Sequence, residues 1–210
     1  MLRLLILVGV LSIAHFLYWF LQPDFRGHPV LFGMLCMVFG YGMLRHGYLW
    51  YHYAAIHVPE KPAEAHDFSV DILTTHVPGE PLDMIEETLR AMQEITYPHT
   101  AYLCDEGDDP YLKQLCLELG VRHVSRDTRK DAKAGNINNA LKQASGDLCL
   151  ILDPDHVPQP DILEHILPHF TNPKVGFVQI VQSYYNKENS LVARGGAQQT
   201  YQFYGPMMMS

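Results

Sequence analysis

Two long apolar runs open the chain, and short apolar runs that alternate with amphipathic segments follow them. The first apolar run extends from Leu2 to Leu21 with Arg3 as its only charge, and the second extends from Pro29 to about Ala55. Each run is long enough to cross about 30 Å of hydrocarbon as a helix. Residues 22–28 between them are mostly polar and contain proline and glycine, so the pattern predicts a transmembrane hairpin of two helices.

A signal peptide is the alternative for residues 1–20, because Arg3 precedes the apolar run. The length of the run, the lack of a clear small-x-small cleavage site and the second apolar segment favour a membrane span. Basic residues before and after the hairpin outnumber Arg26 of its loop by only about two or three, so the charge count is a weak signal for orientation. A cytoplasmic location for the rest of the chain is favoured mainly by the chemistry of the motifs described below. A metal site is less favoured than solvated interfacial side chains for three histidines near the second span, which are His46, His52 and His57.

After a predicted linker at residues 58–67, the pattern changes to short β-rich runs separated by helical periodicity. This alternation is typical of βαβ units with a mostly parallel sheet. The run from Leu148 to Leu152 does not alternate, which predicts a central strand covered on both faces. The predicted domains are therefore the hairpin at 1–57 and an α/β domain at 68–210. The predicted strands are 68–74, 100–104, 121–124, 147–152 and 175–181, and the predicted helices are 82–95, 110–119, 134–144, 161–170 and 190–204.

Composition narrows the possible functions of the α/β domain. The chain is 48% apolar, which excludes a disordered protein. Its net charge of −8 is the sum of about +2 on residues 1–58 and about −10 on the rest. An acidic domain argues against nucleic-acid binding. The cysteines lack the paired spacing of a zinc site and the density of a disulfide scaffold, so we expect free thiols at Cys36, Cys104, Cys116 and Cys149.

Acidic residues follow three of the predicted strands, where ligands bind in open α/β sheets. Glu80 follows the first strand, Asp105 ends the second, and Asp153-Pro154-Asp155-His156 follows the run at 148–152. An acid at such a position can simply cap the next helix, and an Asp-Pro-Asp segment can simply form a turn. Two carboxylates and an imidazole in one turn can also bind one divalent ion, and oxygen ligands favour Mg²⁺ or Mn²⁺. Such an ion neutralises charge on a diphosphate leaving group.

The segment from Lys133 to Leu141 opens a predicted helix with a lysine and a glycine at its amino end. Free amides and the helix dipole favour an anion at such an end, and the Lys133 ammonium adds a positive charge. A solvated lysine beside a capped helix is the alternative. Neither a G-x-G-x-x-G segment after the first strand nor a Walker lysine motif occurs, which excludes those two nucleotide sites.

These motifs, in this order, resemble those of the family 2 glycosyltransferases, which have the GT-A fold, and specifically the processive, cellulose-synthase-like branch. The resemblance covers about residues 68–205 and rests on four segments: Cys104-Asp105-Glu106-Gly107, Lys133-Ala134-Gly135-Asn136, Asp153-Pro154-Asp155-His156-Val157-Pro158 and Phe177-Val178-Gln179. It implies an α/β GT-A domain preceded by the two-helix transmembrane hairpin.

For the nucleotide, the resemblance implies four contacts. Thr75 and Glu80 would lie at the base and ribose, Asp105 at the uracil side, and Lys133 at the diphosphate. The segment from Thr74 to Glu80 is about one residue longer than the Pro-Thr-Tyr-Asn-Glu of relatives.

For the metal and the sugar, the resemblance implies a second group of residues. Asp153 would help to hold uridine diphosphate, and Asp155 and His156 would hold Mg²⁺ or Mn²⁺. Gln179 and Gln182 would lie beneath the donor sugar and the growing chain.

Relatives carry the catalytic base in a Thr-Glu-Asp motif and hold the acceptor with Gln-x-x-Arg-Trp, and neither motif occurs in these residues. The prediction is therefore a fragment whose catalytic base lies beyond Ser210. Its parent would perform inverting transfer from a UDP-sugar, with UDP-glucose favoured, to a polysaccharide extruded across the inner (plasma) membrane, with the enzymatic domain cytoplasmic and synthase subunits as possible partners. The alternatives are a membrane-tethered module that binds a nucleotide or another subunit without catalysis, and a hairpin anchor with an inert domain.

Overall fold

The computed structural model describes residues 1–60, 62 and 67–210 and separates into two compact units. The first unit joins Met1–Glu60 with Gln179–Ser210, and the second, the α/β unit, covers residues 61–178. The predicted linker at 58–67 includes residues 61 and 63–66, which lie outside the described residues. The predicted division into domains at that linker stays a prediction.

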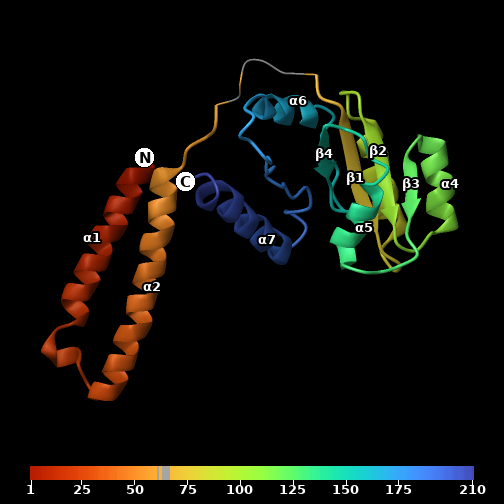
Figure 1. Ribbon diagram of the computed structural model, residues 1–210. Helices are drawn as coiled ribbons and strands as arrows, with labels where there is room; N and C mark the ends of the chain where they lie inside the picture. The colour runs from red at the N-terminus through yellow and green to blue at the C-terminus, as the bar shows by residue number, and fades with distance from the viewer. Residues whose placement is uncertain (61, 63–66) are drawn as a thin grey trace. The chain divides into compact units, whose positions relative to one another are not determined.

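A parallel four-stranded sheet forms the centre of the α/β unit, in the order β3-β2-β1-β4 (Figure 1). The strands are β1 (Val70–His76), β2 (Thr100–Asp105), β3 (Arg122–Ser125) and β4 (Leu148–Ile151). All three pairings are parallel. The carboxyl ends of the strands therefore meet at one edge of the sheet, as the α/β pattern predicts.

Helices cover both faces of this sheet. On one face, the side chains of α3 (Leu82–Gln93), α4 (Pro110–Leu119) and α6 (Ile162–Ile166) pack against alternate residues of the strands. On the other face, α5 (Ala132–Ala140) packs against the remaining positions. The side-chain alternation of β1 explains both layers, since Ile72 belongs to the first core and Leu73 to the second.

Local sequence sets the ends of α4. The Asp109 side chain accepts hydrogen bonds from the amides of Tyr111 and Leu112, and Pro110 occupies the first turn, where a proline costs no hydrogen bond. Gly120 ends the helix with φ of 72°, a conformation that glycine adopts without strain. These signals make α4 coincide with its predicted bounds.

The position of β4 corrects the prediction of a central strand. Among the described residues, β4 pairs only with β1 and lies at the edge of the sheet, and its Cys149 and Ile151 are exposed. The buried central strands are β1 and β2. The unbroken apolar run suggested two covered faces, but the helices cover mainly the sheet positions of β1 and β2.

Two further elements differ from prediction. Residues 175–181, predicted as a strand, form no strand, and the boundary between the two units falls within them, after Val178. The segment therefore pairs with no strand of the described sheet. The helix predicted at 161–170 is α only over Ile162–Ile166 and then tightens to a 3₁₀ turn, η2, over Leu167–Thr171. Pro168 explains this change, because it cannot donate the next helical hydrogen bond.

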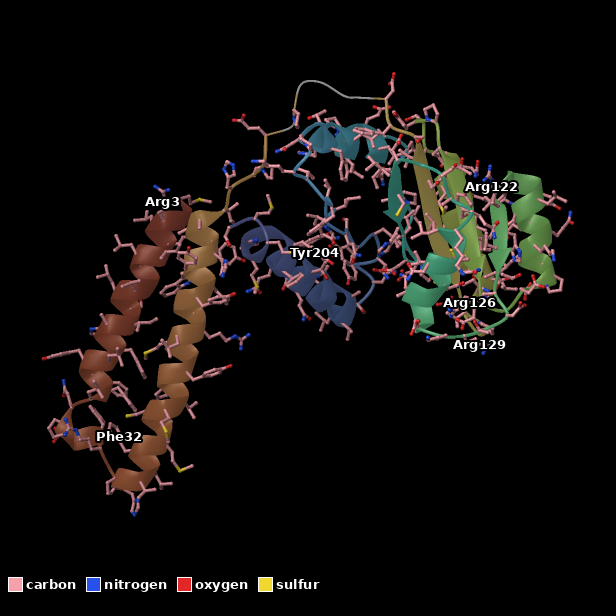
Figure 2. All side chains as sticks on the ribbon, viewed as in Figure 1. Arg3, Phe32, Arg122, Arg126, Arg129 and Tyr204 are labelled. Atoms are coloured by element: carbon pink, nitrogen blue, oxygen red, sulfur yellow. The ribbon has the colours of Figure 1, made fainter. Side chains whose placement is uncertain are left out.

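The first unit begins with the helices α1 (Leu2–Phe20) and α2 (Pro29–Ala55), which are joined through the short turn η1 (Pro23–Phe25). Both helices are long and apolar enough to cross a membrane. Most of their apolar side chains are exposed, as Figure 2 shows. The helices therefore fit the predicted hairpin.

Helix α7 (Leu191–Gln202) and a π turn, η3 (Phe203–Met207), complete this unit. The Ser190 side chain caps α7 by accepting a hydrogen bond from the Ala193 amide. After η3, the Met209 carbonyl accepts a hydrogen bond of 2.6 Å from the His57 amide, which follows α2.

The four cysteines are free, as predicted. Burial raises the pKa of Cys104 and Cys116 to about 12, so both thiols stay protonated.

Candidate functional site

A cavity of about 430 Å³ opens at the carboxyl ends of β1, β2 and β4, beside the start of α5. Its wall combines two cationic side chains, three carboxylates, and several polar and small residues. They are Thr75, Val77, Glu80, Glu106, Arg129, Ala132, Lys133, Asn136, Asp153 and Pro154.

The end of β1 and the turn after it form one side of the cavity. Thr75 is almost fully buried near the end of the strand. The Glu80 side chain turns back and accepts a hydrogen bond of 2.8 Å from the Val77 amide. Gly79, at φ of 102°, supplies the backbone conformation that this tight return requires.

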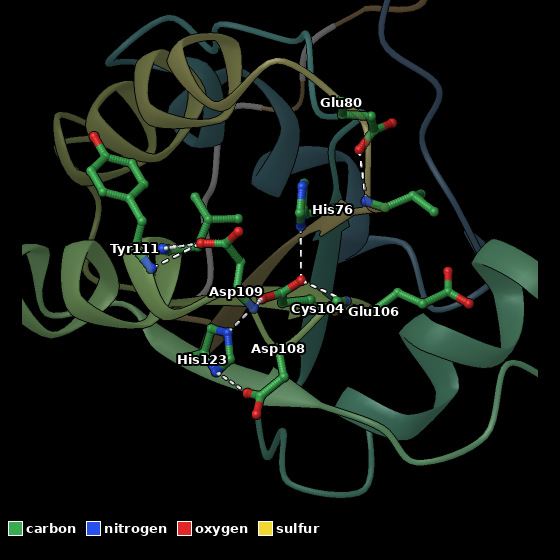
Figure 3. Close-up of polar contacts among 12 residues, drawn as sticks. His76, Glu80, Cys104, Glu106, Asp108, Asp109, Tyr111 and His123 are labelled. Atoms are coloured by element: carbon green, nitrogen blue, oxygen red, sulfur yellow. Dashed lines mark hydrogen bonds and ion pairs between the residues drawn. The ribbon is translucent and has the colours of Figure 1, made fainter.

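Asp105 is the last residue of β2, next to Glu106 of the cavity wall, and is fully buried. One carboxylate oxygen accepts hydrogen bonds from His76 Nδ1 at 2.8 Å and the Gly107 amide at 2.9 Å. The other accepts them from His123 Nε2 at 2.9 Å and the Asp109 amide at 2.6 Å, and Figure 3 shows this network. Burial pushes the pKa of Asp105 upward, but these four hydrogen bonds outweigh burial, so the pKa lies below its ordinary value.

The amino end of α5 brings a cation to the cavity. The Lys133 ammonium forms an ion pair with Asp153, and both side chains are partly exposed. Asn136, one turn further along, is buried and donates a hydrogen bond of 2.7 Å from its Nδ2 to the Cys104 carbonyl. This bond fixes the start of α5 to the end of β2.

Asp153, Asp155 and His156 follow β4 and form a cluster whose potential ligand atoms lie within 4.8 Å of one another. The Asp155 side chain is 68% exposed, and His156 Nε2 lies 3.6 Å from an oxygen of Asp153. On the protein side, the Thr88 hydroxyl of α3 donates a hydrogen bond of 2.8 Å to the Pro154 carbonyl. The hydrogen bond from Thr88 thus anchors the turn to α3, while the Asp155 carboxylate is exposed to solvent.

The cavity brings together four of the six predicted substrate residues, namely Thr75, Glu80, Lys133 and Asp153. Asp105 does not line it: its side chain is fully buried, and each of its oxygens already accepts two hydrogen bonds. Gln179 belongs to the other unit, where its amide Nε2 donates to the Ile180 carbonyl. Its predicted position beneath the sugar stays a prediction.

Sequence reasoning missed two charged residues of the wall, Glu106 and Arg129. Glu106 directly follows Asp105 in the sequence. The prediction therefore identified the correct end of β2 but chose Asp105, whereas Glu106 is the residue that lines the cavity. Arg129 gave no signal, since a basic residue in a polar loop is ordinarily solvated.

A model of glycosyl transferase family 2 matches residues 76–207, which is more than half of the chain. The chain belongs to glycosyl transferase family 2. The matched range contains Asp105, Lys133 and the whole cluster from Asp153 to His156, so the predicted resemblance is confirmed.

Curated relatives of this family 2 chain are cellulose synthase subunits. A cellulose synthase catalytic subunit (UDP-forming) of Xanthomonas axonopodis is 34% identical over 114 residues, covering 52% of this chain and 16% of the relative. Cellulose synthase 1 of Komagataeibacter xylinus is 28% identical over 141 residues, covering 65% of this chain and 9% of the relative. The aligned part is thus a small fraction of the length of these relatives.

Among solved structures, a mannosyltransferase from Pyrobaculum calidifontis, in complex with GDP-Man and Mn²⁺, superposes with a TM-score of 0.56 at 22% identity. The alignment covers 73% of this chain and 48% of that protein. At this level of identity the likeness concerns the fold, and it confirms the predicted GT-A architecture.

Proposed function

We propose that this glycosyltransferase takes its sugar from a UDP-sugar, with UDP-glucose as the favoured donor, and transfers it with inversion to a growing polysaccharide. In that reaction an acceptor hydroxyl attacks the anomeric carbon, the bond from that carbon to the diphosphate oxygen breaks, and UDP leaves. The hydroxyl proton passes to a base that we do not assign within these residues.

The observation that carries this proposal is the cavity that joins Lys133 and Asp153 with the end of β1. A diphosphate needs cationic and N–H donors, which the Lys133 ammonium and the start of α5 supply. Thr75 and Glu80 would contact the base and ribose. Asp105 would serve the uracil side through the 105–109 loop that it holds, with Glu106 as the residue that meets the nucleotide.

We further propose that Asp155 and His156, together with Asp153, hold a divalent ion, Mg²⁺ or Mn²⁺. Oxygen ligands around Mg²⁺ lie about 2.1 Å from the ion and so within roughly 4.2 Å of one another. The observed separations of up to 4.8 Å approach this spacing, and the exposed Asp155 side chain is free to rotate. When bound, such an ion would neutralise charge on the diphosphate leaving group.

The proposed setting is the inner membrane. Helices α1 and α2 would cross the bilayer as a hairpin, so that both of its ends lie on one side. We propose that this side, and with it the α/β unit, is cytoplasmic, where nucleotide sugars are made. The acceptor would be a polysaccharide moving across the same membrane, and Gln179 and Gln182 would lie along its path. The curated cellulose synthase relatives support this setting.

Titration calorimetry of the detergent-solubilised chain with UDP tests the proposal, with and without Mn²⁺. We expect metal-dependent binding that Asp155→Ala weakens at least tenfold, as the loss of a metal ligand does. Asp161→Ala is the matched control, because Asp161 is an exposed aspartate of the next helix that pairs with His165. UDP binding that ignores both the metal and Asp155, or stronger binding of another nucleoside diphosphate, would contradict the proposal.

A further inference from the structure

Arg126 directly follows β3, and its side chain is almost fully buried, at 5% exposure. Its Nη2 donates to Glu106 Oε1 and to the Ala132 carbonyl, each at 2.9 Å, and its Nη1 donates to the Lys130 carbonyl at 2.7 Å. A single guanidinium therefore joins the loop after β2 to the loop before α5. Figure 2 labels Arg126 and its neighbour Arg129 near α5.

The loop that Arg126 holds has an unfavourable backbone. Asp131 and Ala132 both have positive φ, at 61° and 44°. Such conformations cost on the order of 1–3 kcal/mol each for non-glycine residues and persist only where surrounding contacts enforce them. The Arg126 guanidinium accounts for part of this enforcement, because it binds the carbonyls on both sides of Asp131. Lys133 follows this strained pair directly.

Gly135 shows how closely this arrangement is packed. A Cβ at this position would overlap the Lys130 carbonyl oxygen and would lie 2.8 Å from Arg126 Nη1. The loop therefore packs directly on the first turn of α5, with the guanidinium beside this contact. This fold sets where Lys133 enters the cavity.

On the other side of the guanidinium, Glu106 is 9% exposed and borders the cavity. Its Oε1 bonds Arg126, and Arg129 Nε, on an exposed side chain, lies 3.7 Å away. Without Arg126 a buried carboxylate would lose its strongest partner and would turn toward solvent. Arg126 does not itself line the cavity, but it contacts both Glu106 and the loop before Lys133, which do.

We propose that Arg126 is a positioning residue for the donor: it sets the distance between Glu106 and Lys133 and holds the strained loop that presents Lys133 and Arg129 to the nucleotide. This inference rests on the proposed donor site. The three acceptors are Glu106 Oε1 and the carbonyls of Lys130 and Ala132. A planar guanidinium, with N–H groups that point in several fixed directions, can donate to all three, whereas a lysine ammonium does not have this geometry.

The test compares Arg126→Gln, Arg126→Lys and Arg126→Ala with the control Arg122→Gln. Arg122 begins the same strand, but its Nη1 donates to the Tyr102 hydroxyl and it does not line the cavity. Binding of UDP with Mn²⁺ is measured by calorimetry, and hydrogen exchange of the folded proteins is measured without ligand. We expect UDP affinity to fall roughly tenfold or more in all three Arg126 variants, as small misplacements of binding groups do. The control should change less than about twofold.

Two further readouts separate positioning from general stability. Amide exchange should rise in residues 127–133 of the Arg126 variants and stay unchanged in β1. Guanidinium ion at millimolar concentration, far below denaturing conditions, should restore part of the UDP affinity of Arg126→Ala. If Arg126→Gln does not fold, Arg126→Lys, which retains the charge, carries the test.

The inference is overturned if a folded Arg126 variant binds UDP within about twofold of the unchanged protein, or if exchange in 127–133 does not rise. A failure of the proposed function looks different: the unchanged protein would not bind UDP at all, while the exchange experiment would still report on the loop.

Discussion

The carboxyl ends of β2 and β4 both carry aspartates, yet the two regions treat them in opposite ways. Asp105 after β2 is fully buried and accepts four hydrogen bonds, whereas Asp155 after β4 is 68% exposed and lies in a cluster of outward-facing potential ligands. A carboxylate whose oxygens all accept hydrogen bonds from the protein stabilises a loop, whereas a carboxylate with exposed oxygens can bind a ligand. The position of an acid after a strand therefore does not reveal which of these roles it has.

The largest expected effect is on the free energy of unfolding when the buried Asp105 is replaced. Asp105→Ala would leave two histidine N–H groups and two amides without their acceptor, so we expect the free energy of unfolding to fall by roughly 3–5 kcal/mol. Asp155→Ala should change it by less than about 0.5 kcal/mol, because its side chain is exposed. Urea titration with hydrogen exchange in β2 measures both. Similar losses for the two variants would contradict the distinction.

A smaller effect is expected from a change in the packing between Gly135 of α5 and the loop that precedes this helix. Gly135→Ala forces a methyl group against the Lys130 carbonyl and the Arg126 guanidinium, which we expect to cost roughly 1–3 kcal/mol of stability and to weaken UDP binding. Gly195→Ala in α7 is the control, since nothing lies within 4 Å of its added Cβ and alanine favours a helix. A Gly135→Ala protein with unchanged stability and affinity would show that the loop moves freely.

The sequence allowed much of this comparison to be predicted, because local signals determine it. Parallel strands, the helix that begins beside Lys133 and the Asp153–His156 turn all follow from periodicity and from the residues that end strands. These signals act over a few residues. They located Glu80, Lys133 and Asp153, which meet in one cavity with Thr75, a residue that the family resemblance added.

The remaining features depend on contacts between segments that are distant in the sequence. His76 and His123 are 47 positions apart, and only the pairing of β1, β2 and β3 brings both to Asp105. The edge position of β4 is equally non-local, because an apolar run reports burial propensity and not the number of neighbouring strands. Arg126 belongs to the same class, since its partners come from two different loops.

The turn that carries the exposed Asp155 is anchored by the buried Thr88 of α3, and the loss of this anchor should have a third, still smaller effect. Thr88→Val removes the hydroxyl that donates to the Pro154 carbonyl and keeps the shape of the side chain. We expect a loss of about 1 kcal/mol and a severalfold weaker metal-dependent affinity for UDP, because the turn between Asp153 and Asp155 loses its anchor.

The control for this variant is Thr96→Val. Thr96 also donates to a proline carbonyl, that of Pro160, but it is exposed and lies beyond the cluster of potential ligands. Its loss should leave UDP affinity unchanged. Equal weakening by both variants would mean that the whole segment from β4 to α6 responds, and not the turn in particular.

The smallest expected effect is the pH dependence of the stabilisation that the buried Asp105 provides. The pKa of Asp105 lies below its ordinary value in the folded chain, because hydrogen bonds from His76, His123 and two amides favour its charged form. The stabilisation is therefore fully present above the pKa of the unfolded chain, about 3.9, and is lost as the pH falls through the lower folded pKa. Urea titrations of the unchanged protein and of Asp105→Asn at several pH values measure it.

Asparagine has nearly the shape of the carboxyl and no charge, but its NH2 group replaces one acceptor oxygen, so the pH dependence of the stability difference between the two proteins, and not its size, reports the charge of Asp105. We expect that difference to shrink as the pH falls below about 4, where the aspartate takes up its proton in the unfolded chain before it does so in the folded chain. Acid lability from exposed carboxylates such as Asp147 should cancel, because both proteins share it. A difference that stays constant down to the lowest pH would mean that Asp105 acts through its shape and not through its charge.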